Sequence, residues 1–163
     1  MIKLLRVDHR LLHGQVAMTW TQELDTNMYV NPGLTEPCIL IACDAVVKDD
    51  VRKTTLKLAR PAGVKLVIKS VDDSIEALRS GVTDKYRLFI VVESIEDAYR
   101  LAKGYSEIEH INIGGTKPRE GADVRLSSTV FATDRDVELL HELSDAGIEV
   151  EIRQVPRDEK ILI

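Results

Sequence analysis

The feature that most constrains the fold is an alternation of two kinds of segment along the chain. Short runs rich in β-branched residues, such as CILIAC at residues 38–43, are followed by longer stretches whose apolar residues recur at helical spacing. Parallel strands need a crossover of a dozen or more residues between them, and that crossover is usually a helix. The alternation therefore predicts an α/β fold, with a single-domain open, mostly parallel sheet of six or seven strands and helices on both faces.

The individual elements can be placed because residues that cap or stop helices flank the helical stretches. The expected strands are residues 2–7, 38–43, 64–69, 86–92, 110–113 and 148–154, with a weaker one near 124–130. The expected helices are residues 14–24, 50–59, 72–79, 95–103 and 134–145. Residues 27–37 are expected to form a loop, and the tail at 156–163 is either a frayed end or an added edge strand.

Length and charge narrow the class of protein. With 163 residues, one compact domain over residues 1–163 can bury a sizeable core. The 22 Lys and Arg against 27 Asp and Glu leave a net charge of −5, which offers no chain-wide attraction for nucleic acid. No apolar run approaches the roughly 20 residues of a membrane-spanning helix, and the N-terminus becomes charged too soon for a secretory signal. We therefore expect a cytoplasmic protein with no nucleic-acid partner.

The two cysteines, Cys38 and Cys43, flank one expected strand. Their spacing matches no common zinc or redox motif and would place them on opposite faces of that strand. We interpret both as reduced thiols in or near the core, where free cysteine is usually buried. No cluster of metal-ligating residues is apparent along the chain, so neither a metal nor a cofactor is expected.

The segment that carries chemistry follows the first expected strand, where residues 8–16 read DHRLLHGQV. In open α/β sheets, ligands bind beyond the carboxyl ends of the strands. The imidazole of His13 is a suitable phosphoryl acceptor, because one ring nitrogen is a nucleophile near neutral pH while the other is held by a hydrogen bond. Arg10 can clamp phosphoryl oxygens, and Gly14 with the free amides of the next helix can complete an anion site. The alternative is a surface histidine beside an Asp8–Arg10 ion pair.

The same segment carries a resemblance to a known family. Residues 6–16, RVDHRLLHGQV, resemble the signature R-[IV]-D-x-R-L-[IL]-H-G-Q-V of the IIB components of the mannose/fructose/sorbose family of the sugar phosphotransferase system, the EIIB type-4 domain. The likeness continues through Trp20 and, less specifically, through Asp44, the turn at 61–64 and the NIGG motif at 112–115. It therefore covers essentially the whole chain.

The resemblance implies a phosphocarrier subunit, a protein-Nπ-phosphohistidine–sugar phosphotransferase without a cofactor. In that family the histidine matching His13 is phosphorylated by the IIA component, usually on Nδ1, and passes the group to a sugar bound by the membrane components IIC and IID. Carried over to this chain, Arg10 is the phosphoryl clamp, Asp8 orders the loop or orients the imidazole, and Gly14 and Gln15 support the loop. The resemblance implies peripheral association with the transporter and allows a homodimer, but the sugar is not specified.

The motif NIGGTK at residues 112–117 also follows a strand. It resembles a phosphate-cradling turn, since successive small residues can point their amides into one concavity. We interpret it either as a wall of the His13 pocket, with Asn112 and Gly114 supporting the phosphoryl group, or as a purely structural turn.

The remaining histidines and several basic residues have simpler interpretations. His9 occupies a position that varies in the family, and we interpret it as a bystander or at most a modulator. His110 is expected to be a satisfied strand residue and His141 a solvated helix residue. Further positive charge, which either helps to receive a phosphorylated partner or simply covers the surface, comes from Lys117, Arg119 and Arg125.

Two rival functions remain open from the sequence. One is a regulatory or sensory module that keeps the fold and uses phosphorylation as a signal. The other is an unrelated α/β enzyme that binds a sugar phosphate and uses His13 as a general acid or base, which needs a deeper pocket and a second catalytic group. A carrier needs an unprotonated acceptor nitrogen, so we expect phosphorylation to slow below about pH 6.5, the reference value for histidine.

Overall fold

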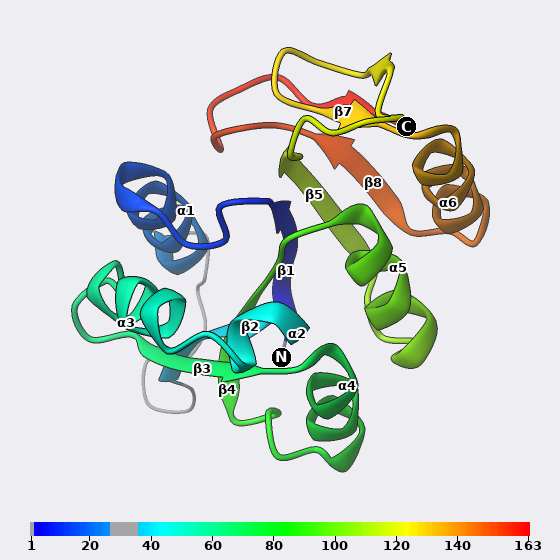
Figure 1. The fold of residues 1–163 in the computed structure, drawn as a ribbon. Helices are drawn as coiled ribbons and strands as arrows, with labels where there is room; N and C mark the ends of the chain where they lie inside the picture. Colours follow the sequence, from blue (N-terminus) through cyan, green and yellow to red (C-terminus); the bar gives the residue numbers. More distant parts are fainter. Residues whose placement is uncertain (1, 27–35) are drawn as a thin grey trace.

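A seven-stranded sheet forms the centre of the molecule in the computed structural model, which describes residues 2–26 and 36–163 (Figure 1). The strand order is β3-β2-β4-β1-β5-β8-β9, and every neighbouring pair is parallel except β8 and β9. The strands are β1 (Ile2–Asp8), β2 (Glu36–Ala42), β3 (Lys65–Lys69), β4 (Tyr86–Val92), β5 (His110–Gly115), β8 (Glu149–Ile152) and β9 (Ile161–Leu162). This confirms the predicted open, mostly parallel α/β sheet.

Helices cover both faces of the sheet, as a parallel sheet requires. The helices are α1 (Gly14–Thr26), α2 (Asp44–Val47), α3 (Asp50–Leu58), α4 (Val71–Ser80), α5 (Ile95–Gly104) and α6 (Asp134–Asp145). One buried apolar cluster joins the sheet to α1, α2 and α3, and a second joins it to α4, α5 and α6. Figure 1 shows α1 and α3 on one side of the sheet and α4, α5 and α6 on the other.

Local sequence explains why the helices begin where they do. Side-chain oxygens of Asp49, Ser70, Ser94 and Thr133 each accept a hydrogen bond from the backbone amide three residues later, which satisfies a donor that the first turn leaves free. In the central strand β4, the last five residues are all buried, because helices pack on both of its faces. The capping residues therefore account for where these four helices begin.

Several predicted boundaries were wrong. The weak strand at 124–130 is instead a small separate hairpin of β6 (Val124–Arg125) and β7 (Phe131–Ala132). The strand predicted at 148–154 ends at Ile152, after which the chain turns away and returns as the antiparallel edge strand β9, one of the two outcomes expected for the tail. The four-residue helix α2 was missed because it is too short to show a helical period. Of the loop predicted at 27–37, residues 27–35 lie outside the described part of the chain, and the last two belong to β2.

The two cysteines lie where their spacing predicted. Both are free and buried, Cys38 in the cluster on the α4–α6 face and Cys43 in the cluster on the opposite face. Burial raises the pKa of the Cys43 thiol to about 11. A protonated, buried thiol is a poor nucleophile, so Cys43 has a structural role.

The sheet topology marks the place for a functional site. β1 lies between β4 and β5, but the helix that follows β1 packs on one face while those that follow its neighbours pack on the other. In doubly wound sheets, such a reversal opens a crevice at the carboxyl ends of the strands. The loop after β1 leaves the sheet at this point.

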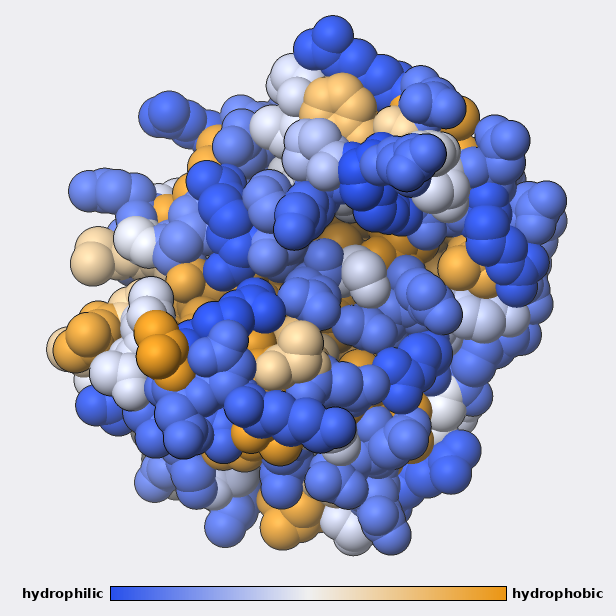
Figure 2. Space-filling view, in the orientation of Figure 1, coloured by the Kyte–Doolittle hydropathy of each residue, from blue (hydrophilic) through white to orange (hydrophobic). Residues whose placement is uncertain are grey.

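The outer surface is largely hydrophilic on the face that Figure 2 shows, with small hydrophobic areas between charged residues. One such area lies at the left edge, over α3, the helix on which Val51 and Leu58 are exposed. Within the described residues, no helix is long and apolar enough to cross a membrane.

Candidate functional site

The loop between β1 and α1 is held in one conformation by two buried leucines. Leu11 and Leu12 both insert into the apolar cluster beneath α1. Leu11 has a φ of 58°, a left-handed conformation that is rare for a leucine, and its amide donates to the Asp8 carbonyl at 2.8 Å. Because burial fixes this turn, the side chains of Arg10 and His13 are directed away from the core, and they are 48% and 24% exposed.

Asp8, the last residue of β1, is the centre of the site. Its side chain is buried, and its Oδ2 atom lies 3.0 Å from Nε2 of His13 and 3.2 Å from Nη2 of Arg6. Its Oδ1 atom accepts a hydrogen bond from the Arg10 backbone amide at 3.0 Å, and the Arg10 Nε lies 3.6 Å away. One carboxylate therefore joins the strand, the loop and the imidazole.

The environment of Asp8 keeps this carboxylate ionised. Burial raises its pKa, but the Arg10 amide, the charge of Arg6 and the hydrogen bond with His13 together outweigh burial, so that the pKa lies below its usual 3.8. An ionised carboxylate can only accept hydrogen bonds. The hydrogen in the Asp8–His13 contact therefore belongs to Nε2, which leaves the lone pair on Nδ1.

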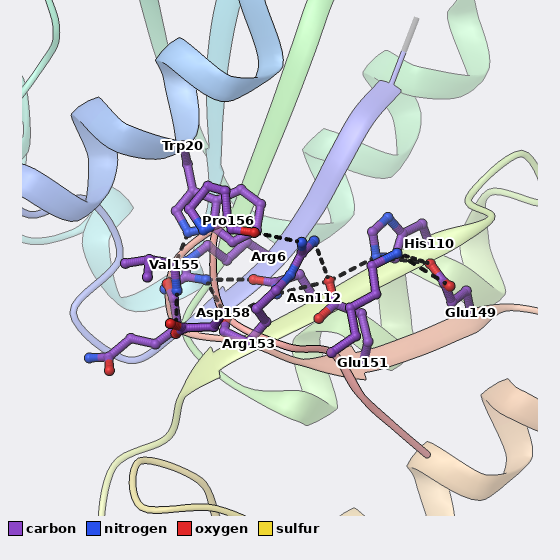
Figure 3. A network of polar contacts seen from close by, with 12 residues as sticks. Arg6, Trp20, His110, Asn112, Glu149, Glu151, Arg153, Val155, Pro156 and Asp158 are labelled. Atoms are coloured by element: carbon purple, nitrogen blue, oxygen red, sulfur yellow. Dashed lines mark hydrogen bonds and ion pairs between the residues drawn. The ribbon is translucent and has the colours of Figure 1, made fainter. Parts of the chain in front are cut away.

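A second row of polar residues lies behind Asp8. Reasoning from the sequence singled out Asn112 among them but missed the roles of Arg6 and Arg153. The Arg6 guanidinium is buried in β1, and its Nη1 donates to Oδ1 of Asn112 and, at 3.2 Å, to the Arg153 carbonyl. The ring of Trp20 lies 5.2 Å from the same guanidinium, within cation–π range. Figure 3 shows this network crossing the sheet from Arg6 towards His110. The available signal was an arginine between apolar residues in the first strand, whose sequence is IKLLRVD.

Gly114 makes room for Arg6. A Cβ atom at Gly114 would lie 2.0 Å from Arg6 Nη2, closer than any real contact. A glycine on β5 is therefore needed for the guanidinium to lie against the sheet and reach Asp8.

The structure brings five of the seven predicted site residues together at the carboxyl end of β1. Gly14 is the first residue of α1, has a φ of 35° and is exposed, as is Gln15. Their parts in phosphoryl transfer, with those of Asp8, Arg10 and His13, stay predictions.

The strand predicted at 110–113 is two residues longer than predicted, so the motif at 112–117 is not a turn over its first four residues. β5 continues through Gly115, because Gly115 pairs with Asp8 and its carbonyl accepts from the His9 amide at 3.1 Å. Asn112 and Gly114 therefore lie inside the sheet beside Arg6. Their backbone is part of a β-strand and does not form an open concavity. Lys117 is exposed beyond the strand end.

The other histidines and basic residues differ in their contacts and exposure. His110 has Nε2 3.0 Å from Glu151 and 3.3 Å from Glu149, which confirms a satisfied strand residue, and His141 is exposed on α6. The backbone of His9 is paired, but its buried Nδ1 has no hydrogen-bond partner among the described residues. Of the three basic residues beyond β5, Arg119 pairs with Asp136, and Arg125 lies over the Phe131 ring.

A groove of ≈ 440 Å³ lies beside the loop, between α1 and the segment after β8. Gln15 is among its lining residues, but His13 is not. Across residues 2–26 and 36–163, no group of three or more His, Cys, Asp or Glu side chains is placed to hold a metal ion. The side chains gathered at the site are an imidazole, a carboxylate and two arginines.

The chain is similar to proteins of one known family. The family model described as the sorbose subfamily IIB component of the phosphotransferase system matches residues 2–162. A probable phosphotransferase enzyme IIB component of Streptococcus pyogenes is 39% identical over 69% of this chain, and the match covers 63% of that protein. The mannose-specific EIIAB component of Escherichia coli is 32% identical over 98% of this chain, which spans 46% of its length.

Solved structures show the same fold. The IIBSor domain of the sorbose permease from Klebsiella pneumoniae superposes with a TM-score of 0.87 at 27% identity, over 99% of this chain and 92% of that one. A further relative by sequence is the sorbose-specific EIIB component of Lacticaseibacillus casei. It is 32% identical over 96% of this chain and 89% of its own length. The chain belongs to the sorbose subfamily of IIB components of the sugar phosphotransferase system.

Proposed function

We propose that this chain is a phosphocarrier that accepts a phosphoryl group on Nδ1 of His13 from the phosphohistidine of a IIA component. It then passes the group to a sugar held by the membrane components IIC and IID, at which it acts as a peripheral subunit. The observation that carries the proposal is the 3.0 Å contact between Asp8 Oδ2 and His13 Nε2. That contact selects the tautomer in which Nδ1 is the nucleophile.

In the first step, the Nδ1 lone pair attacks phosphorus, and the N–P bond of the donor breaks with its electron pair returning to the donor ring. Because Nε2 keeps its hydrogen, the His13 ring becomes positively charged as the new N–P bond forms. The buried, ionised Asp8 lies where it stabilises that charge, as a buried aspartate does for a catalytic imidazolium.

In the second step, a sugar hydroxyl oxygen attacks phosphorus, the Nδ1–P bond breaks, and the electron pair returns to Nδ1. The hydroxyl proton leaves to solvent or to a base of the membrane partner. His13 is thereby restored in its starting form.

The negative charge on the phosphoryl group needs hydrogen-bond donors or positive charges beside it. Arg10 is half-exposed beside His13, and its guanidinium presents several donors to phosphoryl oxygens. Gly14 opens a helix of 13 residues, whose first-turn amides are free to bind an anion. Arg10 and the start of α1 therefore supply the clamp, and Gln15 and Gly14 support it.

The deciding experiment incubates the protein with a phosphorylated IIA component and maps the labelled residue. We expect an acid-labile label at His13 that is absent from His13→Ala. A label that survives acid, or equal labelling of His13→Ala, would refute the carrier function.

A second measurement distinguishes the carrier function from the two alternative functions, a regulatory module and an acid–base enzyme. Addition of membranes that contain IIC, IID and sugar should discharge the labelled protein and yield sugar phosphate. A regulatory module would keep its label under these conditions. An enzyme that uses His13 as a general acid or base would turn over sugar phosphate without a labelled intermediate.

The sugar and the oligomeric state are separate matters. Relatives are described as mannose-specific, sorbose-specific or N-acetylgalactosamine-specific, so these sugars are the first to test in the discharge assay. A homodimer is proposed from the family resemblance alone, and sedimentation of the purified chain tests it.

A further inference from the structure

We propose that Glu151, acting through Asn112 and Arg6, is a positioning residue that holds the Asp8 carboxylate in place and so fixes the tautomer of His13. The inference rests on the proposed carrier function of His13. It assigns a role in that function to a carboxylate two strands away from the loop.

Arg6, Asn112 and Glu151 form one row across three adjacent strands. Arg6 on β1 is the register partner of Asn112 on β5, and Asn112 is the register partner of Glu151 on β8. All three side chains are buried, and Asn112 is hydrogen-bonded to Arg6 on one side and to Glu151 on the other. Figure 3 shows them side by side on one face of the sheet. The row is a continuous polar path towards Asp8.

Glu151 orients the Asn112 amide. Glu151 Oε1 accepts a hydrogen bond from Asn112 Nδ2 at 3.1 Å, and the Arg153 carbonyl accepts a second at 3.0 Å. With two acceptors on that side, the amide must present its NH₂ group to Glu151 and its Oδ1 atom to Arg6. The carboxylate and the Arg153 carbonyl together therefore set which way the amide faces.

The oriented Asn112 then holds Arg6. The Asn112 Oδ1 and the Arg153 carbonyl both accept from Nη1, so the other terminal nitrogen, Nη2, is directed at Asp8 Oδ2 at 3.2 Å. The guanidinium is planar and rigid, which means that fixing one end fixes the other. The position of Asp8 Oδ2, and hence of its contact with His13, follows from the row.

The charge of Glu151 also balances the arginines around it. Its Oε1 lies 3.0 Å from Arg153 Nη2, and hydrogen bonds from His110, Arg153 and Asn112 outweigh burial and hold its pKa below the usual 4.5. Its Oε2 has no hydrogen-bond partner within the described residues. A buried carboxylate with one oxygen unsatisfied is costly, and a role in positioning accounts for it.

The test measures the His13 tautomer directly, by long-range ¹H–¹⁵N NMR of the unphosphorylated protein at pH 8. We expect the wild-type protein to show the Nε2–H tautomer. Asn112→Leu and Glu151→Leu should shift His13 towards a mixture of both tautomers and slow phosphorylation by about 10-fold, the usual effect of losing an outer-shell partner. Glu151→Gln keeps an acceptor for Asn112, so it should fall between these variants and the wild type.

Asp136→Asn is the matched control. Asp136 is also a buried carboxylate paired with an arginine, but it caps α6 and has no link to the row. This variant should lose stability and keep both the His13 tautomer and the transfer rate.

The inference is overturned if the folded Asn112→Leu and Glu151→Gln variants keep the wild-type tautomer, whatever their stability. It is equally overturned if Asp136→Asn shifts the tautomer as much as they do. The tautomer measurement needs no donor, so it decides the inference even if wild-type protein fails to accept a phosphoryl group, which would refute only the carrier function.

Discussion

Oδ2 of Asp8 lies 3.0 Å from Nε2 of His13 and also accepts from Arg6 at 3.2 Å. One oxygen atom therefore couples a buried arginine to the partly exposed ring of the proposed phosphoryl acceptor. Asp8 contacts the imidazole at Nε2, and Nδ1 is the proposed phosphoryl acceptor. Most of the predictions below depend on this shared oxygen.

Asp8→Asn should reduce the rate of His13 phosphorylation by ~10²-fold, the lower end of the contribution that general acid–base groups make to a rate. An amide can donate to the ring as well as accept, so the Nε2–H tautomer loses its preference, and the developing positive charge loses its counter-ion. Single-turnover labelling with phosphorylated IIA component measures the rate. Unchanged kinetics in a folded Asp8→Asn protein would contradict the tautomer argument.

Arg10→Ala should slow phosphorylation by about 100-fold, as loss of one donor to a charged transition state typically does. Its effect on the free energy of unfolding should stay below about 1 kcal/mol, because the side chain is half-exposed and its ion pair with Asp8 is long at 3.6 Å. Arg10→Lys should be intermediate, since lysine keeps the charge but not the planar fork. Parallel urea unfolding separates the two effects, and normal transfer by Arg10→Ala would remove it from the clamp.

Gly114→Ala should destabilise the fold by about 1–3 kcal/mol through overpacking and displace Arg6, because the new Cβ would lie 2.0 Å from Nη2. Gly115→Ala is a matched control in the same strand, since its Cβ would meet only ordinary contacts at 3.7 Å. Thermal unfolding and His13 labelling of both variants check the prediction. If both variants lost equal stability and equal labelling, the close approach of Arg6 would not be the reason for a glycine at position 114.

The stability of the domain should depend on pH through Asp8 and Glu151. Both carboxyls have pKa values lowered in the folded state from 3.8 and 4.5, so their contribution is full above those values and is lost as pH falls through the folded pKa. The stability difference between wild type and Glu151→Gln should therefore be constant near pH 7 and shrink below about pH 4.5. Urea unfolding from pH 7 to pH 3 measures it. A difference that stays constant to pH 3 would mean that Glu151 is not held ionised.

Much of the fold could be predicted because its signals are local. β4 matches its predicted range, Tyr86–Val92, and α6 matches Asp134–Asp145, since each has a clear apolar run or a capping residue at its start. The hairpin of β6 and β7 and the short α2 could not be found in this way, because two to four residues show no period. The end of β8 was misplaced because no glycine or proline marks a turn between Ile152 and Pro156.

The candidate site divides in the same way. The sequence by itself determined the loop at residues 8–16, because the acid, the arginine, the histidine and the glycine are close along the chain and follow a strand. Only the tertiary structure decided what lies behind the loop. Arg6, Asn112 and Glu151 meet because β1, β5 and β8 are neighbours in register, and parallel pairing between strands so distant in sequence depends on how the crossover helices pack. No local sequence pattern specifies this strand pairing, so the buried row beneath His13 appears only in the folded chain.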